Sequence, residues 1–135
     1  MTPPLTPVYA WLRDQLADAT GSPVAVAELP PDATPPYAVI AGVPGGAGEP
    51  DGTSHNWRLN PLIQIEAVGT TALESSQLAD DITQALAGIR WPTRIEAGPS
   101  AEAWHMHLIG RPGRRKNDPR ALYQTVHTIE LKVTP

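Results

Sequence analysis

The stretch from Trp57 to Gly88 constrains the fold most, because it joins a long alternating strand to a capped amphipathic helix. Between residues 57 and 68 the odd positions are almost wholly apolar, and the even positions are mainly polar. Side chains of a strand alternate between its two faces, so this pattern predicts a strand with one face on a core. Pro61 cannot donate to a strand ladder, and it predicts a bulge, an edge position or a break into two shorter strands.

A helix is predicted directly after this strand, over about residues 72–87. Thr71 and Glu74 have the spacing of a capping box, in which each side chain bonds the backbone N–H of the other residue. Apolar side chains recur at helical spacing and form one stripe, made of Leu78, Ile82, Ala85 and Leu86. Gly88 is expected to end the helix in the left-handed conformation, which glycine adopts at low cost.

A second helix and further strands flank this unit. Thr6 and Pro7 suit the start of a helix over about residues 7–19, with an apolar face of Val8, Trp11, Leu12, Leu16 and Ala19. Strand patterns follow at 24–27, 37–41, 89–95, 101–109 and 122–133, and the strand at 37–41 is expected in the sheet interior. The element order α-β-β-β-α-β-β-β predicts one α+β domain over residues 1–135. Its sheet is expected to be mostly antiparallel, with four to six strands and both helices on one face.

Two loops stand out as candidate contact surfaces. The first, at about 44–56, is rich in glycine and is expected to be mobile, either as a plain connection or as an arm that orders against a neighbouring subunit. The second, at about 110–120, is basic, with Arg111, Arg114, Arg115, Lys116 and Arg120. These cations could hold phosphates, dock on an acidic protein surface, or form a solvated hairpin tip. This loop lacks the interleaved aromatic side chains that single-strand binding uses.

Composition excludes several classes of protein. The net charge of −4 argues against a dedicated nucleic-acid binder, and the absence of cysteine excludes disulfides and thiolate metal sites. No apolar run approaches the roughly 20 residues that span a bilayer, and the first residues do not have the pattern of a signal peptide. We therefore expect no membrane partner and a cytosolic setting.

Histidines and carboxylates do not form a recognisable reactive set. His105 and His107 share one strand face, but His127 alternates with core residues and is expected on the other side of the sheet, hydrogen-bonded and half-buried. Trp104, Met106 and Leu108 are expected to face the core from the strand that carries the first two histidines. Asp80, Asp81 and Glu74 fall on an exposed helix face, and no nucleophile elbow or phosphate loop is present. We therefore expect no catalytic residues, no metal and no cofactor, and a protein that is not an enzyme.

The layout resembles the tail terminator, or tail completion, proteins of long-tailed phages and prophages. The resemblance lies in the helix that ends near Gly21, the segment Pro36–Ile40, the strand Ile63–Ala67, the helix segment Leu78–Ile82 and the final strand that starts at Leu122-Tyr123. It implies a homohexameric ring on the head-proximal end of the tail tube, which stops polymerisation of the tube protein and binds the head-completion protein. It also implies assembly in the host cytoplasm, a place in the tail or neck of the virion, and a lumen through which DNA passes without specific binding.

Ring interfaces are head-to-tail, so the two loops are the candidate subunit or partner contacts. The candidate residues are Gly45, Gly46, Asp51, Trp57, Arg58, Arg111, Arg114, Arg115, Lys116 and Arg120. Acidic residues such as Glu66 or Asp80 would suit the lumen, because they repel DNA. Ala67-Val68 and the high charge of the basic loop depart from the family pattern, so another neck or head-completion protein stays open. A small binding module or an enzyme unrelated to phage assembly is the third hypothesis.

Overall fold

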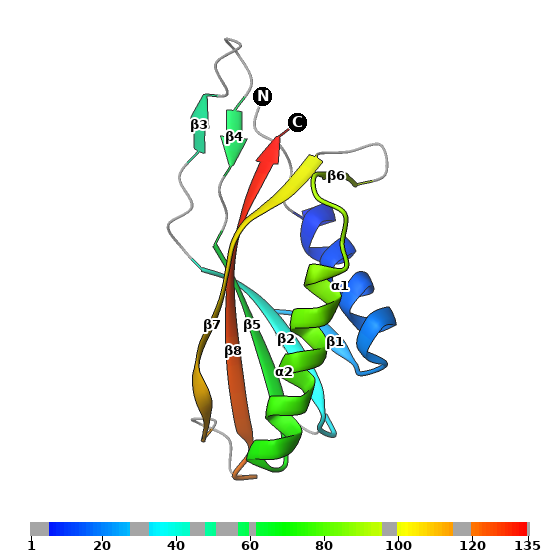
Figure 1. The fold of residues 1–135 in the computed structure, drawn as a ribbon, viewed down its shortest axis with the longest axis vertical. Coiled ribbons are helices and arrows are strands. Elements are labelled where there is room, and N and C mark those ends of the chain that lie inside the picture. Colours follow the sequence, from blue (N-terminus) through cyan, green and yellow to red (C-terminus); the bar gives the residue numbers. More distant parts are fainter. Residues whose placement is uncertain are drawn as a thin grey trace.

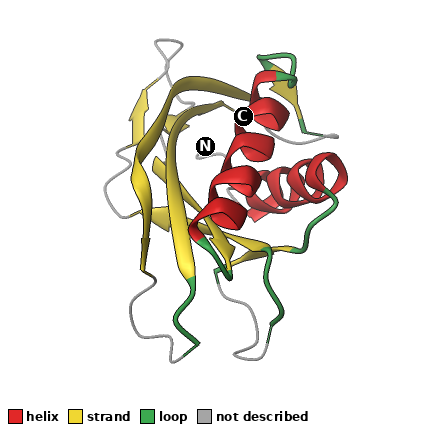
Figure 2. Ribbon diagram, turned by 60° about the horizontal axis from the view of Figure 1, so that its bottom comes forward, coloured by secondary structure: helices red, strands yellow, loops and turns green. Residues whose placement is uncertain are grey.

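Two helices cover one face of a curled sheet in the computed structural model of this chain (Figures 1 and 2). The helices are α1 (Thr6–Thr20) and α2 (Ala72–Ala87), and the strands are β1 (Val24–Val26), β2 (Tyr37–Val43), β3 (Gly48–Pro50), β4 (Trp57–Leu59), β5 (Leu62–Gly69), β6 (Thr93–Arg94), β7 (Ser100–Arg114) and β8 (Tyr123–Thr134). The structure describes residues 6–27, 33–43, 48–50, 57–59, 62–95, 100–114 and 120–134. Within them, the side chains of 42–43, 48–50, 57–59, 103–112 and 134 are not described.

The sheet is mixed, and β8 lies at its centre. β5 and β4 border one edge of β8, whereas β7 borders the other edge from Ser100, opposite Thr134, to Arg114, opposite Tyr123. β2 separates β5 from β1, and β1 is parallel to β2 while the remaining described pairs are antiparallel. The predicted α+β class, with both helices on one face, is confirmed. The described sheet has eight strands, whereas four to six were expected.

The central strand is described on both sides of Pro61, with Leu59 of β4 opposite Val133 and Leu62 of β5 opposite Glu130 of β8. Residues 60 and 61 lie outside the described residues, so the predicted bulge, edge position or break at Pro61 stays a prediction. Along β5 the side chains of Ile63, Ile65 and Ala67 are fully buried under the helices, whereas the alternate residues up to Glu66 are only partly buried. The predicted alternation of faces is therefore confirmed over β5.

Helix α2 starts with the predicted cap in a modified form. The Thr71 hydroxyl accepts from the Glu74 N–H at 3.1 Å, but the Glu74 carboxylate accepts from the Thr70 N–H at 2.8 Å. The predicted return bond to Thr71 is wrong by one residue, because the carboxylate reaches the exposed donor one position earlier. Gly88 ends the helix with φ −80°, so its predicted left-handed conformation is also wrong. The Gly88 N–H still donates to the Gln84 carbonyl, which keeps the last turn α-helical.

Helix α1 packs beside α2 and completes the core. Its buried residues are Val8, Leu12 and Leu16, whereas Ala19, predicted on the apolar face, is exposed. Gly21 follows the helix with φ +70°, a backbone conformation that favours glycine. The main core lies between helices and sheet and contains, among others, Ile40, Ile82, Leu86, Ile129 and Leu131. A smaller cluster on the opposite face of the sheet contains Tyr37, Val39, Val68 and Leu122.

Both predicted loops are partly strand. Residues 48–50 of the glycine-rich segment pair with β4, and this hairpin projects from the end of the sheet where β8 ends (Figure 1). In the basic segment, β7 continues to Arg114, opposite Tyr123. The loop boundaries at 44–56 and 110–120 are therefore wrong, because backbone pairing with a neighbouring strand extends into both. The predicted mobility of the first loop concerns residues 44–47 and 51–56, which lie outside the described residues.

Candidate interaction surfaces

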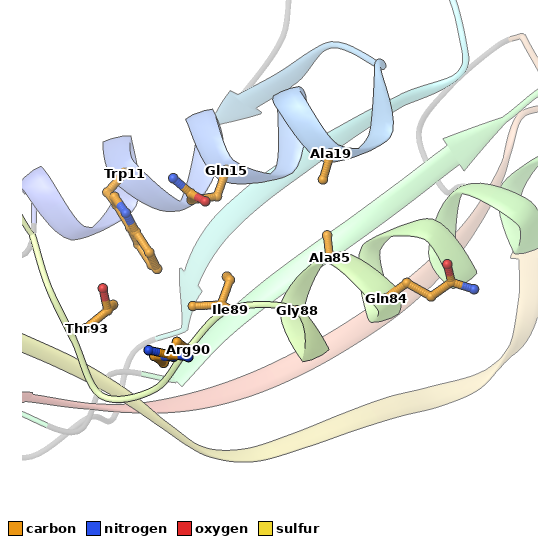
Figure 3. Close-up of a pocket in the computed structure, with 9 residues that line it drawn as sticks. All are labelled: Trp11, Gln15, Ala19, Gln84, Ala85, Gly88, Ile89, Arg90 and Thr93. Carbon is orange, nitrogen blue, oxygen red and sulfur yellow. The ribbon is translucent and has the colours of Figure 1, made fainter.

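A groove runs between α1 and the C-terminal end of α2 (Figure 3). Its volume is about 490 Å³, and the residues that line it are Trp11, Gln15, Ala19, Gln84, Ala85, Gly88, Ile89, Arg90 and Thr93. Ala19 on α1 and Ala85 on α2 point toward one another across it, so small side chains leave the space between the helices open. Among the described lining residues Arg90 alone carries a charge, and it is exposed.

Two tryptophans fix one end of this groove. The rings of Trp11 and Trp91 meet edge to face, with centroids 5.8 Å apart. The Trp91 indole N–H donates to the Leu86 carbonyl at 3.4 Å, which holds the segment after α2 against the helix. The helix patterns at 7–19 and 72–87 contained most of these residues, but sequence reasoning missed the groove. It depends on how closely the two helices pack, and the local signal was the set of small residues at 19, 85 and 88.

An exposed leucine lies at the other end of α2. Leu73, in the first helical turn, is 68% exposed, whereas the buried stripe of the helix includes Leu78, Ile82 and Leu86. Its neighbour Glu74 is acidic and only partly buried. An apolar side chain at this position adds nothing to the core, so it is available for contact with another molecule.

The basic segment contributes two described cations with intramolecular contacts. Arg114, at the end of β7, lies over the Tyr123 ring with its guanidinium carbon 5.7 Å from the ring centroid. Arg120 donates to the Ala33 carbonyl and so ties the turn before β8 to the chain before β2. Arg111 lies on β7 without a described side chain, and Arg115 and Lys116 lie outside the described residues.

The projecting hairpin carries two of the other candidate contact residues. Trp57 pairs with Pro50 and Arg58 pairs with Glu49 in the backbone register of β4 and β3. Gly45, Gly46 and Asp51 lie outside the described residues, as do the side chains of the hairpin. Their predicted contacts with a neighbouring subunit stay predictions.

The two acidic residues considered for a lumen lie on opposite faces of the molecule. Glu66 alternates with Ile65 and Ala67, which face the helices, so its side chain lies on the open face of the sheet. Asp80 is exposed on α2, which covers the other face. One lumen surface built from a single face can therefore contain only one of them.

Buried hydroxyl groups join α2 to the sheet. Ser75 donates to the Ala67 carbonyl at 2.8 Å, and its oxygen lies 2.7 Å from the Thr125 hydroxyl. Because the single Ser75 proton goes to the carbonyl, Thr125 must be the donor to Ser75. Both side chains are sealed from solvent, so this pair is structural and cannot act as a nucleophile on an outside substrate.

A second polar pair involves His127, which is hydrogen-bonded as predicted but is buried and not half-buried. Its Nε2 lies 2.7 Å from the Thr83 hydroxyl, which donates to the Ala79 carbonyl at 3.0 Å. Both bonds can exist together only when Nε2 carries the proton and donates to Thr83. Burial lowers the pKa of His127, and the Asp80 carboxylate and the Ala79 carbonyl oppose that shift only in part. The imidazole is therefore neutral at pH 7.

Metal and membrane features can be assessed for part of the chain. Among the described residues, no three His, Asp or Glu side chains gather closely enough to hold a metal ion. The side chains of Trp104, His105, Met106, His107 and Leu108 are not described, so their predicted faces stay predictions. Within the described helices, none has the length and apolar character that a membrane span requires.

Comparison with known proteins gives a similarity of fold. No family model matches the chain, and no curated protein matches it. Its fold is similar to that of a chain in the solved structure "Virion of native gene transfer agent (GTA) particle", with a TM-score of 0.55. The two chains are 14% identical, and the match covers 92% of each. At this identity the similarity shows the fold alone, and it extends over almost the whole of both chains.

Proposed function

We propose that this chain is a structural protein of a phage-like particle, whose copies form a ring that caps the head-proximal end of a tail tube. The observation that carries the proposal is the fold similarity to a chain of a gene transfer agent virion, over 92% of both chains. The element pattern that resembles tail terminator proteins supports the same class independently. In this role the ring stops polymerisation of the tail tube protein and joins the tail to the head-completion protein.

Copies of the chain are the first partner in this proposal, as a homohexamer. The projecting β3–β4 hairpin, with Trp57 and Arg58, is available to reach an adjacent subunit. The basic segment is available to bind an acidic surface of a subunit or of another neck protein. Its members Arg114 and Arg120 are held in place by Tyr123 and by the chain before β2. DNA passes through the lumen without specific binding, since the net charge of −4 disfavours tight association with phosphates.

Two measurements test this function. Native mass spectrometry of the purified protein should give a closed oligomer, with a hexamer as the expected species. Addition of that oligomer to polymerising tail tube protein should shorten the tubes seen by electron microscopy, and it should label one tube end. A monomer at high protein concentration, or tubes of unchanged length and unlabelled ends, contradicts the proposal.

A different neck or head-completion component is the second candidate, because a fold shared with a chain of a virion particle fits more than one position in such a particle. Such a protein would form an oligomer but would bind the head connector and leave tube length unchanged. Binding assays with the connector and with the tail tube, run side by side, separate the two roles. A small binding module or an enzyme unrelated to phage assembly would instead be a monomer that binds a small ligand.

A further inference from the structure

The two ends of α2 carry surfaces of opposite shape. At its N-terminal end Leu73 projects into solvent, with 68% of the residue exposed. At its C-terminal end the groove of about 490 Å³ opens between the helices. The exposed stripe of α2 leads from Leu73 through Gln77 to Gln84 and ends in the groove at Gly88. The helix rises 1.5 Å per residue, so the two features are roughly 22 Å apart.

The groove has the chemistry to receive an apolar side chain with an acid beside it. Its lining combines the apolar Trp11 and Ile89 and the small Ala19, Ala85 and Gly88 with the polar Gln15, Gln84, Arg90 and Thr93 (Figure 3). Its volume exceeds that of a leucine side chain, so the side chain can enter without a rearrangement of the helices. The charged residue at the groove is Arg90, and the residue after Leu73 is Glu74. Shape and charge are therefore complementary between the two ends of the same helix.

We propose that Leu73 of one copy inserts into the groove between α1 and α2 of the next copy, with Glu74 facing Arg90. This inference rests on the proposed function, because it requires that the chain assemble with itself. In a ring each copy directs its leucine toward one neighbour and its groove toward the other, so the contact is head-to-tail. Head-to-tail contacts produce a closed ring when the rotation between copies closes. Each copy in such a ring uses one leucine and one groove.

Single substitutions at the two surfaces should weaken assembly without unfolding the chain. Leu73→Gln removes the apolar side chain from an exposed helical position, where glutamine is a good helix former. Burial of a leucine in a groove predicts an oligomer that is about 10- to 100-fold weaker in this variant. Ala19→Trp fills the groove from an exposed position and should weaken assembly in the same way. Thermal unfolding of each variant checks that the fold is retained.

Two matched substitutions serve as controls. Val26→Thr makes another exposed apolar residue polar, and Ala87→Trp adds the same bulk to α2 at an exposed position that does not line the groove. Both control variants should keep the oligomer mass of the original protein. Loss of the oligomer in the controls as well overturns the assignment of these two surfaces.

Mixing the two disrupted variants gives the sharpest test. The Ala19→Trp chain keeps its leucine, and the Leu73→Gln chain keeps its groove, so a mixture contains one intact contact per pair. The expected result is a 1:1 heterodimer by native mass spectrometry, at a protein concentration where each variant alone is mostly monomeric. Such a pair cannot grow, because the remaining leucine position and the remaining groove are both disrupted. Failure of the mixed variants to associate overturns the inference.

Cross-linking gives a second, direct readout, because the chain contains no cysteine. Leu73→Cys chains mixed with Ala85→Cys chains and treated with a short bifunctional thiol reagent should yield covalent dimers. An oligomer that keeps its mass in both Leu73→Gln and Ala19→Trp overturns this inference but leaves the proposed ring in place. A monomeric original protein at high concentration overturns both, so the two failures are distinguishable.

Discussion

The buried hydroxyl pair between α2 and β8 predicts that Thr125→Val changes the free energy of unfolding in opposite directions in the original chain and in a Ser75→Ala chain. Ser75 donates to the Ala67 carbonyl and accepts from Thr125, so the three groups form a chain of two hydrogen bonds. Ser75→Ala breaks both bonds and leaves the Thr125 hydroxyl buried without its acceptor. Thr125→Val breaks one bond, leaves no donor unsatisfied, and keeps the shape of the side chain.

The expected energies follow from this asymmetry. A buried hydrogen bond contributes about 0.5–1.5 kcal/mol, and a buried donor without a partner costs about 1–3 kcal/mol. Ser75→Ala should therefore lower the free energy of unfolding by about 2–4 kcal/mol, and Thr125→Val should lower it by about 1 kcal/mol. In the Ser75→Ala background, Thr125→Val removes the unsatisfied hydroxyl, so there it should raise the free energy of unfolding by about 1 kcal/mol. The effect of Thr125→Val on the free energy of unfolding thus has opposite signs in the two chains.

Urea unfolding followed by circular dichroism measures these values for the four chains of the double-mutant cycle. All four chains are compared at one protein concentration, because assembly adds to apparent stability. Ser76→Ala, at the neighbouring helix position, is the matched control for the change in helix propensity and should leave the free energy of unfolding within about 0.5 kcal/mol. Additive losses for the two substitutions would refute the hydrogen-bond chain and its assigned donor.

Three further predictions concern pH, a close backbone contact and a surface arginine. Because burial lowers the pKa of His127, the imidazole binds a proton more tightly in the unfolded chain than in the folded chain. The free energy of unfolding should therefore fall as the pH drops below about 6.5, by at most about 1.4 kcal/mol per pH unit. Urea unfolding at several pH values should show a smaller dependence on pH for His127→Gln. A Cβ at Gly69 would lie 2.6 Å from the Ser75 backbone nitrogen, so Gly69→Ala should destabilise the fold by about 1–3 kcal/mol and lower the midpoint of thermal unfolding. Gly113 has open space around it, so Gly113→Ala is the control and should leave that midpoint unchanged. Arg114→Ala removes the contact with a tyrosine ring and should cost about 0.5–1 kcal/mol in chemical denaturation, and an unchanged value would exclude a stabilising contribution.

The local elements were readable from the sequence because their signals lie within a few residues. The Thr71 cap, the apolar stripe of α2 and the alternation along β5 each depend on spacings of two to four positions. Helix bounds predicted at 7–19 and 72–87 agree with the structure to within one residue.

The wrong predictions concern hydrogen bonds and strand pairing that depend on which groups lie close together in three dimensions. The Glu74 carboxylate bonds Thr70 rather than Thr71, and Gly88 keeps a helical φ because its N–H continues the bonding of the last turn. Strand pairing extended β7 to Arg114, into a segment whose charge predicted a loop. Among the candidate contact residues, the sequence indicated the chemistry, but it could not assign Arg114 to Tyr123 or Arg120 to the chain before β2.

The sequence by itself determined the α+β class, the two helices and the alternating strands, because periodicity and caps are properties of short stretches. Only the tertiary structure decided the partners that lie far apart in the chain. Ser75 and Thr125 are 50 residues apart, and the groove joins residues 11–19 to residues 84–93. Such contacts depend on how closely α1, α2 and the sheet pack, and no local pattern of residues specifies that distance.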